Sequence, residues 1–228
     1  MSRIPRVVVP GLPHYVTQRG RRHQQTFFAD DDYAVYLESL LAGCERTGTL
    51  ILAYCLLPSQ VSLLLVPSSE DGLRIAIADT HRRHARAINL REGWQGRLWQ
   101  ERFASFPTDA RHMLSAAKHI EMGPVDAKLV AHPAEYRWSS ARAHISGEQD
   151  GVIDPSPLLN AGRGWERTLL SGRDLEMAET FRLHENTGRP LGSVDFLRFV
   201  ERTLGRTLIP KKRGRKKKDC PGSESTFQ

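Results

Sequence analysis

The apolar and polar positions of the first 125 residues follow two different periods along the chain. Segments with a period of two, typical of β-strands, cover residues 14–20, 50–57, 61–66 and 98–106. Segments with a period of three to four, typical of α-helices, cover residues 30–48, 69–93 and 109–122. Pro124 limits the third helix, because proline lacks the backbone N–H that a helix interior requires. The pattern predicts seven elements in the order β-α-β-β-α-β-α.

This order predicts an α+β fold of the ferredoxin-like kind, built on a split β-α-β unit with one added helix. Its sheet is expected to have four antiparallel strands with helices on one face. The other face is then open to nucleic acid or to a partner subunit. Such an architecture does not identify a function, because many unrelated proteins share it.

The remaining residues predict a helical extension. Residues 138–144 are expected to form a short helix that turns Trp138 inward, and the segment from 154 to 184 is expected to be largely helical. Ser193 is the expected N-cap of a last helix, with apolar positions that end at Leu204. We therefore expect a main domain over residues 1–147, a helical extension over residues 148–204 and a basic disordered tail over residues 205–228.

The positive charge of the chain is concentrated in the tail. The net charge is +7, yet eight basic residues and no acidic ones lie between Arg206 and Lys218. The rest of the chain is almost neutral, with 25 basic and 26 acidic residues. A run of this density repels itself and suits a polyanion such as nucleic acid. The alternative, a solubilising tail, is less favoured because the neutral body has no need of one.

The cysteines and the hydropathy pattern indicate a cytoplasmic protein. The three cysteines, Cys44, Cys55 and Cys220, are odd in number and lack metal-ligand spacing, which is typical of free thiols in a reducing compartment. Cys55 is expected to be buried. No apolar run reaches the roughly 20 residues of a membrane span, and the first residues do not read as a signal peptide.

The segment Tyr54-Cys55-Leu56-Leu57-Pro58-Ser59-Gln60-Val61-Ser62 is the most informative motif of the chain. Two apolar runs flank a Pro-Ser turn signal, so two neighbouring strands are expected. Gln60 and Ser62 are two positions apart on the second strand and should point to the same face.

This motif resembles the HUH motif of single-tyrosine transposases, especially of the REP-associated branch. In that family the pattern reads Tyr-Cys-Leu-Met-Pro-Asn-His-hydrophobic-His-Leu, and the two histidines ligate a divalent metal. Further similarity, in the same order, lies at residues 9–20, 25–28, 31–33, 98–103, 124–127, 138–141 and 187–192, and in the basic tail. The resemblance implies a protein that acts on single-stranded DNA near hairpins, by metal-assisted attack of a tyrosine on a phosphate.

Carried onto this sequence, the family's catalytic positions hold other residues. Gln60 and Ser62 replace the two histidine ligands, and Gly123 replaces the polar residue that completes the metal shell. His119 stands at the position of the nucleophilic tyrosine. The resemblance therefore implies a DNA-binding protein defective in strand cleavage, without the Mg²⁺ or Mn²⁺ of its relatives. Two alternatives stay open: an active transposase with unconventional ligands, in which His119 could be the nucleophile, and a general nucleic-acid-binding module.

Arginines and lysines are the candidate DNA contacts, with single-stranded or hairpin DNA as the expected partner. In the folded part of the chain they are Arg19, Arg21, Arg22, Arg82, Arg86 and Arg102, and in the tail Lys211, Lys212, Arg213, Arg215, Lys216, Lys217 and Lys218. Arg82 and Arg86 share a helix face, where like charges repel unless an anion or an acidic partner lies nearby. For Arg19, Arg21 and Arg22 a solvated turn is about equally favoured.

Three residues near these candidates are assigned to other roles, and the assembly is left open. Trp99 is expected in the core, and Glu101 and Glu121 are expected as surface carboxylates. No membrane contact is expected, and the sequence does not determine the oligomeric state.

Overall fold

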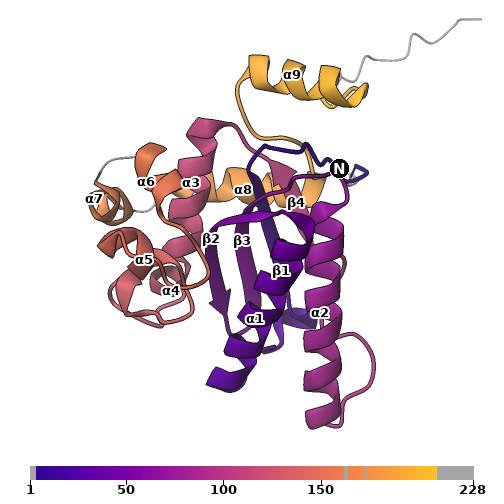
Figure 1. Ribbon diagram of the computed structural model, residues 1–228, viewed down its shortest axis with the longest axis vertical. Helices are drawn as coiled ribbons and strands as arrows, with labels where there is room; N and C mark the ends of the chain where they lie inside the picture. Colours follow the sequence, from indigo (N-terminus) through magenta and orange to yellow (C-terminus); the bar gives the residue numbers. More distant parts are fainter. Residues whose placement is uncertain (1–3, 162–163, 173, 210–228) are drawn as a thin grey trace, which may run out of the picture.

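The computed structural model describes residues 4–161, 164–172 and 174–209. Its centre is a sheet of four antiparallel strands in the order β2-β3-β1-β4 (Figure 1). The strands are β1 (His14–Arg19), β2 (Leu50–Leu57), β3 (Gln60–Val66) and β4 (Ala104–Pro107). The predicted α+β class and the four-stranded antiparallel sheet are confirmed.

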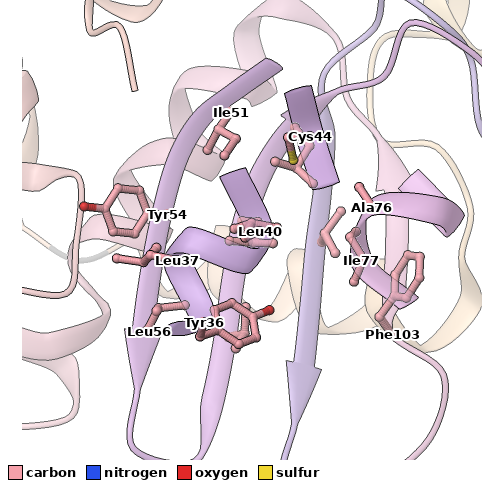
Figure 2. Close-up of a cluster of buried hydrophobic side chains, with 14 of the residues drawn as sticks. Tyr36, Leu37, Leu40, Cys44, Ile51, Tyr54, Leu56, Ala76, Ile77 and Phe103 are labelled. Carbon is pink, nitrogen blue, oxygen red and sulfur yellow. The ribbon is translucent and has the colours of Figure 1, made fainter. Parts of the chain in front are cut away.

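Two long helices cover one face of this sheet. Helix α1 (Asp30–Thr47) connects β1 to β2, and α2 (Gly72–Arg91) connects β3 to β4. Their apolar side chains meet those of β2 and β3 in a buried cluster that includes Tyr36, Leu40 and Leu56 (Figure 2). Because β3 lies between β1 and β2, the helix α1 crosses over a strand, as the split β-α-β prediction requires.

The opposite face is covered too, which corrects the expectation of helices on one face only. Helix α3 (Ala110–Glu121) lies against β2 and β3, and α8 (Leu175–Thr187) lies against β4, while α6 (Ser156–Ala161) and α7 (Trp165–Leu170) pack on α3 (Figure 1). The physical reason is the composition of the strands. Tyr15, Ala53 and Leu64 make this face as apolar as the first one, and an apolar face needs a cover.

The hairpin between β2 and β3 follows the prediction. Leu57 and Gln60 pair across the sheet, so Pro58 and Ser59 form a two-residue connection. Cys55 is buried, as expected, with Cys44 on the other side of the sheet. Trp99 and Trp138 are both buried, in agreement with the sequence analysis.

The predicted fourth strand, residues 98–106, is wrong over most of its length. Only Ala104–Pro107 forms β4, while Trp99 makes an isolated bridge to Gly20. Polar residues at 100–102 are consecutive and exposed, which breaks the alternation that a half-buried strand needs. The Trp99 indole N–H instead donates to the carbonyl of His81 at 3.0 Å, so this segment is tied to α2.

Short elements complete the fold. They are η1 (Arg21–His23), α4 (Gly123–Asp126), η2 (Pro133–Glu135), α5 (Ala141–Ser146) and α9 (Val194–Leu204). Pro124 ends α3 as predicted, but it also lies in the first turn of α4, where its missing N–H costs nothing. Helix α9 packs on the N-terminal segment through Val200, Val7 and Val9 (Figure 1). Across the described ranges no helix combines the length and apolarity of a membrane span.

The borders at residues 147 and 204 stay predictions. Leu158, Trp165 and Phe181 of the extension are buried with Tyr15 of the sheet. The tail candidates Lys211, Lys212, Arg213, Arg215, Lys216, Lys217 and Lys218, together with Cys220, lie outside the described residues.

Candidate functional site

The candidate ligand positions lie at the start of β3. Gln60 and Ser62 share a face of the sheet, as predicted, and the Gln60 amide donates to Ser62 Oγ at 2.9 Å. Arg19 pairs with Gln60 across the sheet, and its Nε donates to Gln60 Oε1 at 3.0 Å. The same guanidinium lies 2.8 Å from the Glu185 carboxylate on α8. A continuous polar chain therefore runs from α8 through Arg19 to β3.

Tyr15 forms the apolar floor of this site. Its ring stacks on Phe106 and on Phe181, with ring centroids 5.3 Å apart in both pairs. Burial raises the pKa of the Tyr15 hydroxyl well above its ordinary value, and the neighbouring Glu185 raises it further. This phenol stays protonated and enclosed, so it is no substitute for a nucleophilic tyrosine.

These residues do not fit a divalent metal. Gln60 offers a neutral amide and Ser62 a neutral hydroxyl, and both already hold hydrogen bonds. The charged group bonded to Gln60 is the Arg19 guanidinium, a cation itself, which repels a second cation. In the part of the chain that the structure describes, no three His, Cys, Asp or Glu side chains are grouped as metal ligands require.

His119 lies on α3, at the wall of a cavity of about 250 Å³. Its ring centroid is 6.2 Å from that of Tyr15 and 5.1 Å from that of Phe181. The structure thus brings His119 beside Tyr15, on the face of the sheet that carries Gln60 and Ser62. Lys118 and Asp174 line the same cavity.

Gly123, the third expected ligand position, faces β2. A Cβ atom built there would lie 3.7 Å from Cys55 Sγ and 3.8 Å from Leu57 Cδ1. These are ordinary contact distances, so the first side-chain carbon of another residue would fit. The glycine itself offers no ligand atom.

Glu121 is a correction to the sequence analysis, because it is fully buried rather than on the surface. One carboxylate oxygen accepts from Ser140 Oγ at 2.6 Å and from His144 Nδ1 at 2.5 Å. The other accepts from the Trp165 indole N–H at 2.7 Å. Glu121 therefore ties α3 to α5 and α7 and has no access to a substrate.

The predicted arginine contacts separate into two groups. Arg19 is held by Gln60 and Glu185 and is only partly exposed. Arg82, which shares a helix face with Arg86, has an acidic partner, because its guanidinium lies 2.5 Å from the Asp79 carboxylate. Arg83 and Arg46 share the same carboxylate.

The exposed arginines gather around the loop that follows α2. Arg97 and Arg102 line one surface depression, next to the paired Arg82, and Arg97 and Arg21 line a second. Arg22 and Arg86 are exposed on η1 and α2. Arg97 is not among the predicted contacts, because residues 98–106 were expected to form a strand.

Two exposed aromatic side chains in this region were also missed. Phe28 and Trp94 are 39% and 40% exposed, and their rings meet edge to face with centroids 5.8 Å apart. The signal in the sequence was the segment Gly93-Trp94-Gln95-Gly96, which puts a large aromatic residue between two glycines.

One known structure shares this fold. A REP-associated tyrosine transposase bound to a REP hairpin matches the chain with a TM-score of 0.55 and 17% identity, over 67% of this chain and 88% of that chain. The chain has a tyrosine transposase fold. A Deinococcus radiodurans protein described as a presumed transposase matches with a TM-score of only 0.37 and 17% identity, over 52% of this chain and 95% of that chain. Neither a protein family model nor a curated protein matches the sequence.

A fold shared at 17% identity carries no catalytic assignment by itself. The side chains of Arg19, Gln60 and Ser62 are joined by hydrogen bonds, and they lie on the face of the sheet that is covered by α3 with His119.

Proposed function

We propose that this protein binds single-stranded or hairpin DNA and does not cut it. The observation that carries the proposal is the Arg19 guanidinium, bonded to Gln60 and paired with Glu185 where the resemblance expects a metal. A guanidinium that is already paired with a carboxylate supplies neither the double positive charge nor the open coordination positions of the divalent metal that phosphate cleavage uses. In this reading the chain acts in the cytoplasm as a binder or blocker of the hairpins that its relatives cut.

The expected partner is supported by charge and by fold. The chain has the fold of a transposase that was solved bound to a REP hairpin. Its exposed Arg21, Arg97 and Arg102, with the basic tail, supply cationic groups for phosphates.

Binding is tested with a fluorescently labelled REP-type hairpin and a scrambled single strand of equal length. We expect tighter binding of the hairpin at every salt concentration, with both affinities falling as salt rises. Equal affinities throughout would favour the general nucleic-acid-binding module instead. Absence of binding at low salt would refute the proposal.

Cleavage is tested separately by incubating the same hairpin with protein and Mn²⁺ and resolving the products on denaturing gels. We expect neither nicked DNA nor a covalent protein–DNA adduct. An adduct that disappears in His119→Ala and persists in His112→Ala would establish the alternative, an active enzyme with a histidine nucleophile. His112 is a suitable control because it lies on the same helix, where it pairs with Asp109.

A further inference from the structure

The loop after α2 presents an indole ring to solvent by means of its own hydrogen bonds. Gly93 and Gly96 adopt positive φ angles of 65° and 96°, which allow the chain to reverse tightly on both sides of Trp94. The Trp94 backbone N–H donates to the Asn89 carbonyl at 2.8 Å, and the Asn89 side-chain amide donates to the Gly96 carbonyl at 2.9 Å. The exposure of Trp94 is therefore built into the turn.

Trp94 is unusual among the tryptophans of the chain. Trp99, Trp138 and Trp165 are 8%, 9% and 3% exposed, whereas Trp94 is 40% exposed. Its edge-to-face contact with Phe28 fixes the angle of the ring and leaves aromatic surface uncovered. The uncovered ring faces of this pair are available for stacking with a ligand.

The charges around this pair favour an anionic partner. Trp94 lines a depression of about 320 Å³ together with Arg21, Arg97 and Gln24. The nearby Arg91 pairs with both Asp32, at 2.6 Å, and Glu92, at 2.8 Å, so these three side chains leave one negative charge against the two positive charges of Arg21 and Arg97. Among the described residues we find no ion pair for Arg21 or Arg97, so both guanidinium groups are available for phosphates.

We propose that Phe28, Trp94, Arg21 and Arg97, here called the Trp94 surface, stack and hold an unpaired nucleotide of bound DNA. An aromatic face beside cationic groups is the arrangement that single-stranded nucleic acid requires, since bases stack on the ring while arginines contact phosphates. Arg21 follows the β1 residue Arg19 by two positions, so this surface begins directly after the first strand of the sheet. This inference rests on the proposed function and names the part of the DNA that the surface would contact.

The full-length protein tests the inference through its own fluorescence. Because Trp94 is the one exposed tryptophan of the four, stacking should quench its emission when a hairpin with a single-stranded flank is added. We expect Trp94→Ala to remove this quenching and to weaken binding of the flanked hairpin about tenfold or more, as for the loss of one stacked base. A blunt hairpin without the flank should bind wild type and Trp94→Ala equally.

Two variants separate stacking from structural damage. Trp94→Phe keeps an aromatic face and should retain most of the affinity. Leu90→Ala removes another exposed apolar side chain, 83% exposed near the end of α2, and should change nothing. Arg21→Gln and Arg97→Gln should each lower the salt dependence of binding by about one unit of slope while quenching at saturation persists.

The outcomes distinguish this inference from the proposed function. Equal affinity of wild type and Trp94→Ala for the flanked hairpin, with unquenched tryptophan emission, would overturn the stacking site and leave DNA binding intact. Failure of the wild-type protein to bind any DNA would overturn both.

Discussion

The guanidinium of Arg19 on β1 lies 2.8 Å from the carboxylate of Glu185 on α8. Glu185 is only 5% exposed, while the Arg19 side chain is 32% exposed and also donates to Gln60. The pair therefore joins the C-terminal extension to the strands that carry the candidate ligand positions. The partly exposed Arg19 compensates the nearly buried Glu185. Neutralising Glu185 and neutralising Arg19 should therefore lower the free energy of unfolding by different amounts.

We expect Glu185→Gln to lower the free energy of unfolding by roughly 1–3 kcal/mol. Breaking a buried pair leaves an uncompensated charge, and the partial exposure of Arg19 moderates the cost. Urea unfolding at pH 7 measures the change. Glu179→Gln is the matched control, because Glu179 lies on the same helix and is exposed. Equal stabilities of the two variants would show that the Arg19–Glu185 pair contributes nothing.

Placing two imidazoles at positions 60 and 62 should not by itself create a metal site. In Gln60→His/Ser62→His the Arg19 guanidinium still lies beside the introduced imidazoles, and its charge opposes a divalent ion. We expect the melting temperature of this double variant to be unchanged by Mn²⁺. Adding Arg19→Gln removes the competing cation, and the triple variant should gain Mn²⁺-dependent stability. A Mn²⁺-dependent increase in the double variant would contradict this role of Arg19.

The sequence predicts the sheet well because its strands carry clear local signals. The two-residue connection at Pro58-Ser59, and with it the shared face of Gln60 and Ser62, follows from turn chemistry and a period of two. The partner of Arg19 could not be predicted in this way. Glu185 comes close to it only when α8 folds back on the sheet, and no local pattern encodes that contact.

The burial of Glu121 also depends on contacts between distant parts of the chain, which local sequence patterns do not encode. A glutamate near the end of a helix is usually solvated, so local reasoning assigned it to the surface. The buried position depends on three donors, Ser140, His144 and Trp165, that come from later segments of the chain. Only the assembled tertiary structure supplies them.

We expect Glu121→Gln to destabilise the protein by roughly 1–3 kcal/mol. An amide accepts through one oxygen only and turns an NH₂ group toward donors that are buried, which leaves polar groups unsatisfied. Chemical denaturation measures the loss. Glu101→Gln is the control, since Glu101 is exposed and should change stability by less than about 0.5 kcal/mol. DNA affinity of the folded Glu121→Gln variant should equal that of wild type, because Glu121 is buried and does not belong to the proposed contacts.

Truncation after Ile209 should weaken DNA binding and reduce its salt dependence. It removes the seven basic residues from Lys211 to Lys218 and retains Arg206, whose guanidinium donates to the Pro5 and Arg6 carbonyls. For single strands each phosphate that a basic side chain no longer neutralises lowers the slope by about 0.7, so a decrease of up to about 5 units is expected. Titrations of the two proteins at several salt concentrations give this difference. An unchanged slope would exclude the tail from binding.

The buried imidazole of His14 should make the stability of the protein depend on pH. The Val9 N–H donates to His14 Nε2 at 3.2 Å, so that nitrogen carries no proton, and Nδ1 donates to the Leu12 carbonyl at 2.8 Å. A second proton would have to enter at Nε2, directly against a backbone donor. Burial lowers the pKa of His14 to about 4, although the Leu12 carbonyl opposes the shift.

The sign of the effect follows from the two pKa values. Above pH 6.5, the ordinary value, His14 is neutral in both the folded and the unfolded chain and does not change stability. Below pH 6.5, His14 binds a proton in the unfolded chain but not in the folded chain, so stability falls until the pH reaches about 4. Between pH 6.5 and 5 the loss from this residue should be about 1.6 kcal/mol, because the slope approaches its full value of about 1.4 kcal/mol per pH unit only below pH 6.5.

Urea unfolding of wild type and His14→Gln at several pH values isolates this contribution. Other buried histidines, such as His81, act equally in both proteins and cancel in the comparison. We expect His14→Gln to be less stable than wild type at pH 7, because it loses the two hydrogen bonds of the imidazole. Between pH 6.5 and 4 its free energy of unfolding should depend less steeply on pH than that of wild type, by the contribution of about one proton. Parallel stability profiles would mean that His14 accepts its proton in the folded protein, which the Val9 N–H bond does not allow.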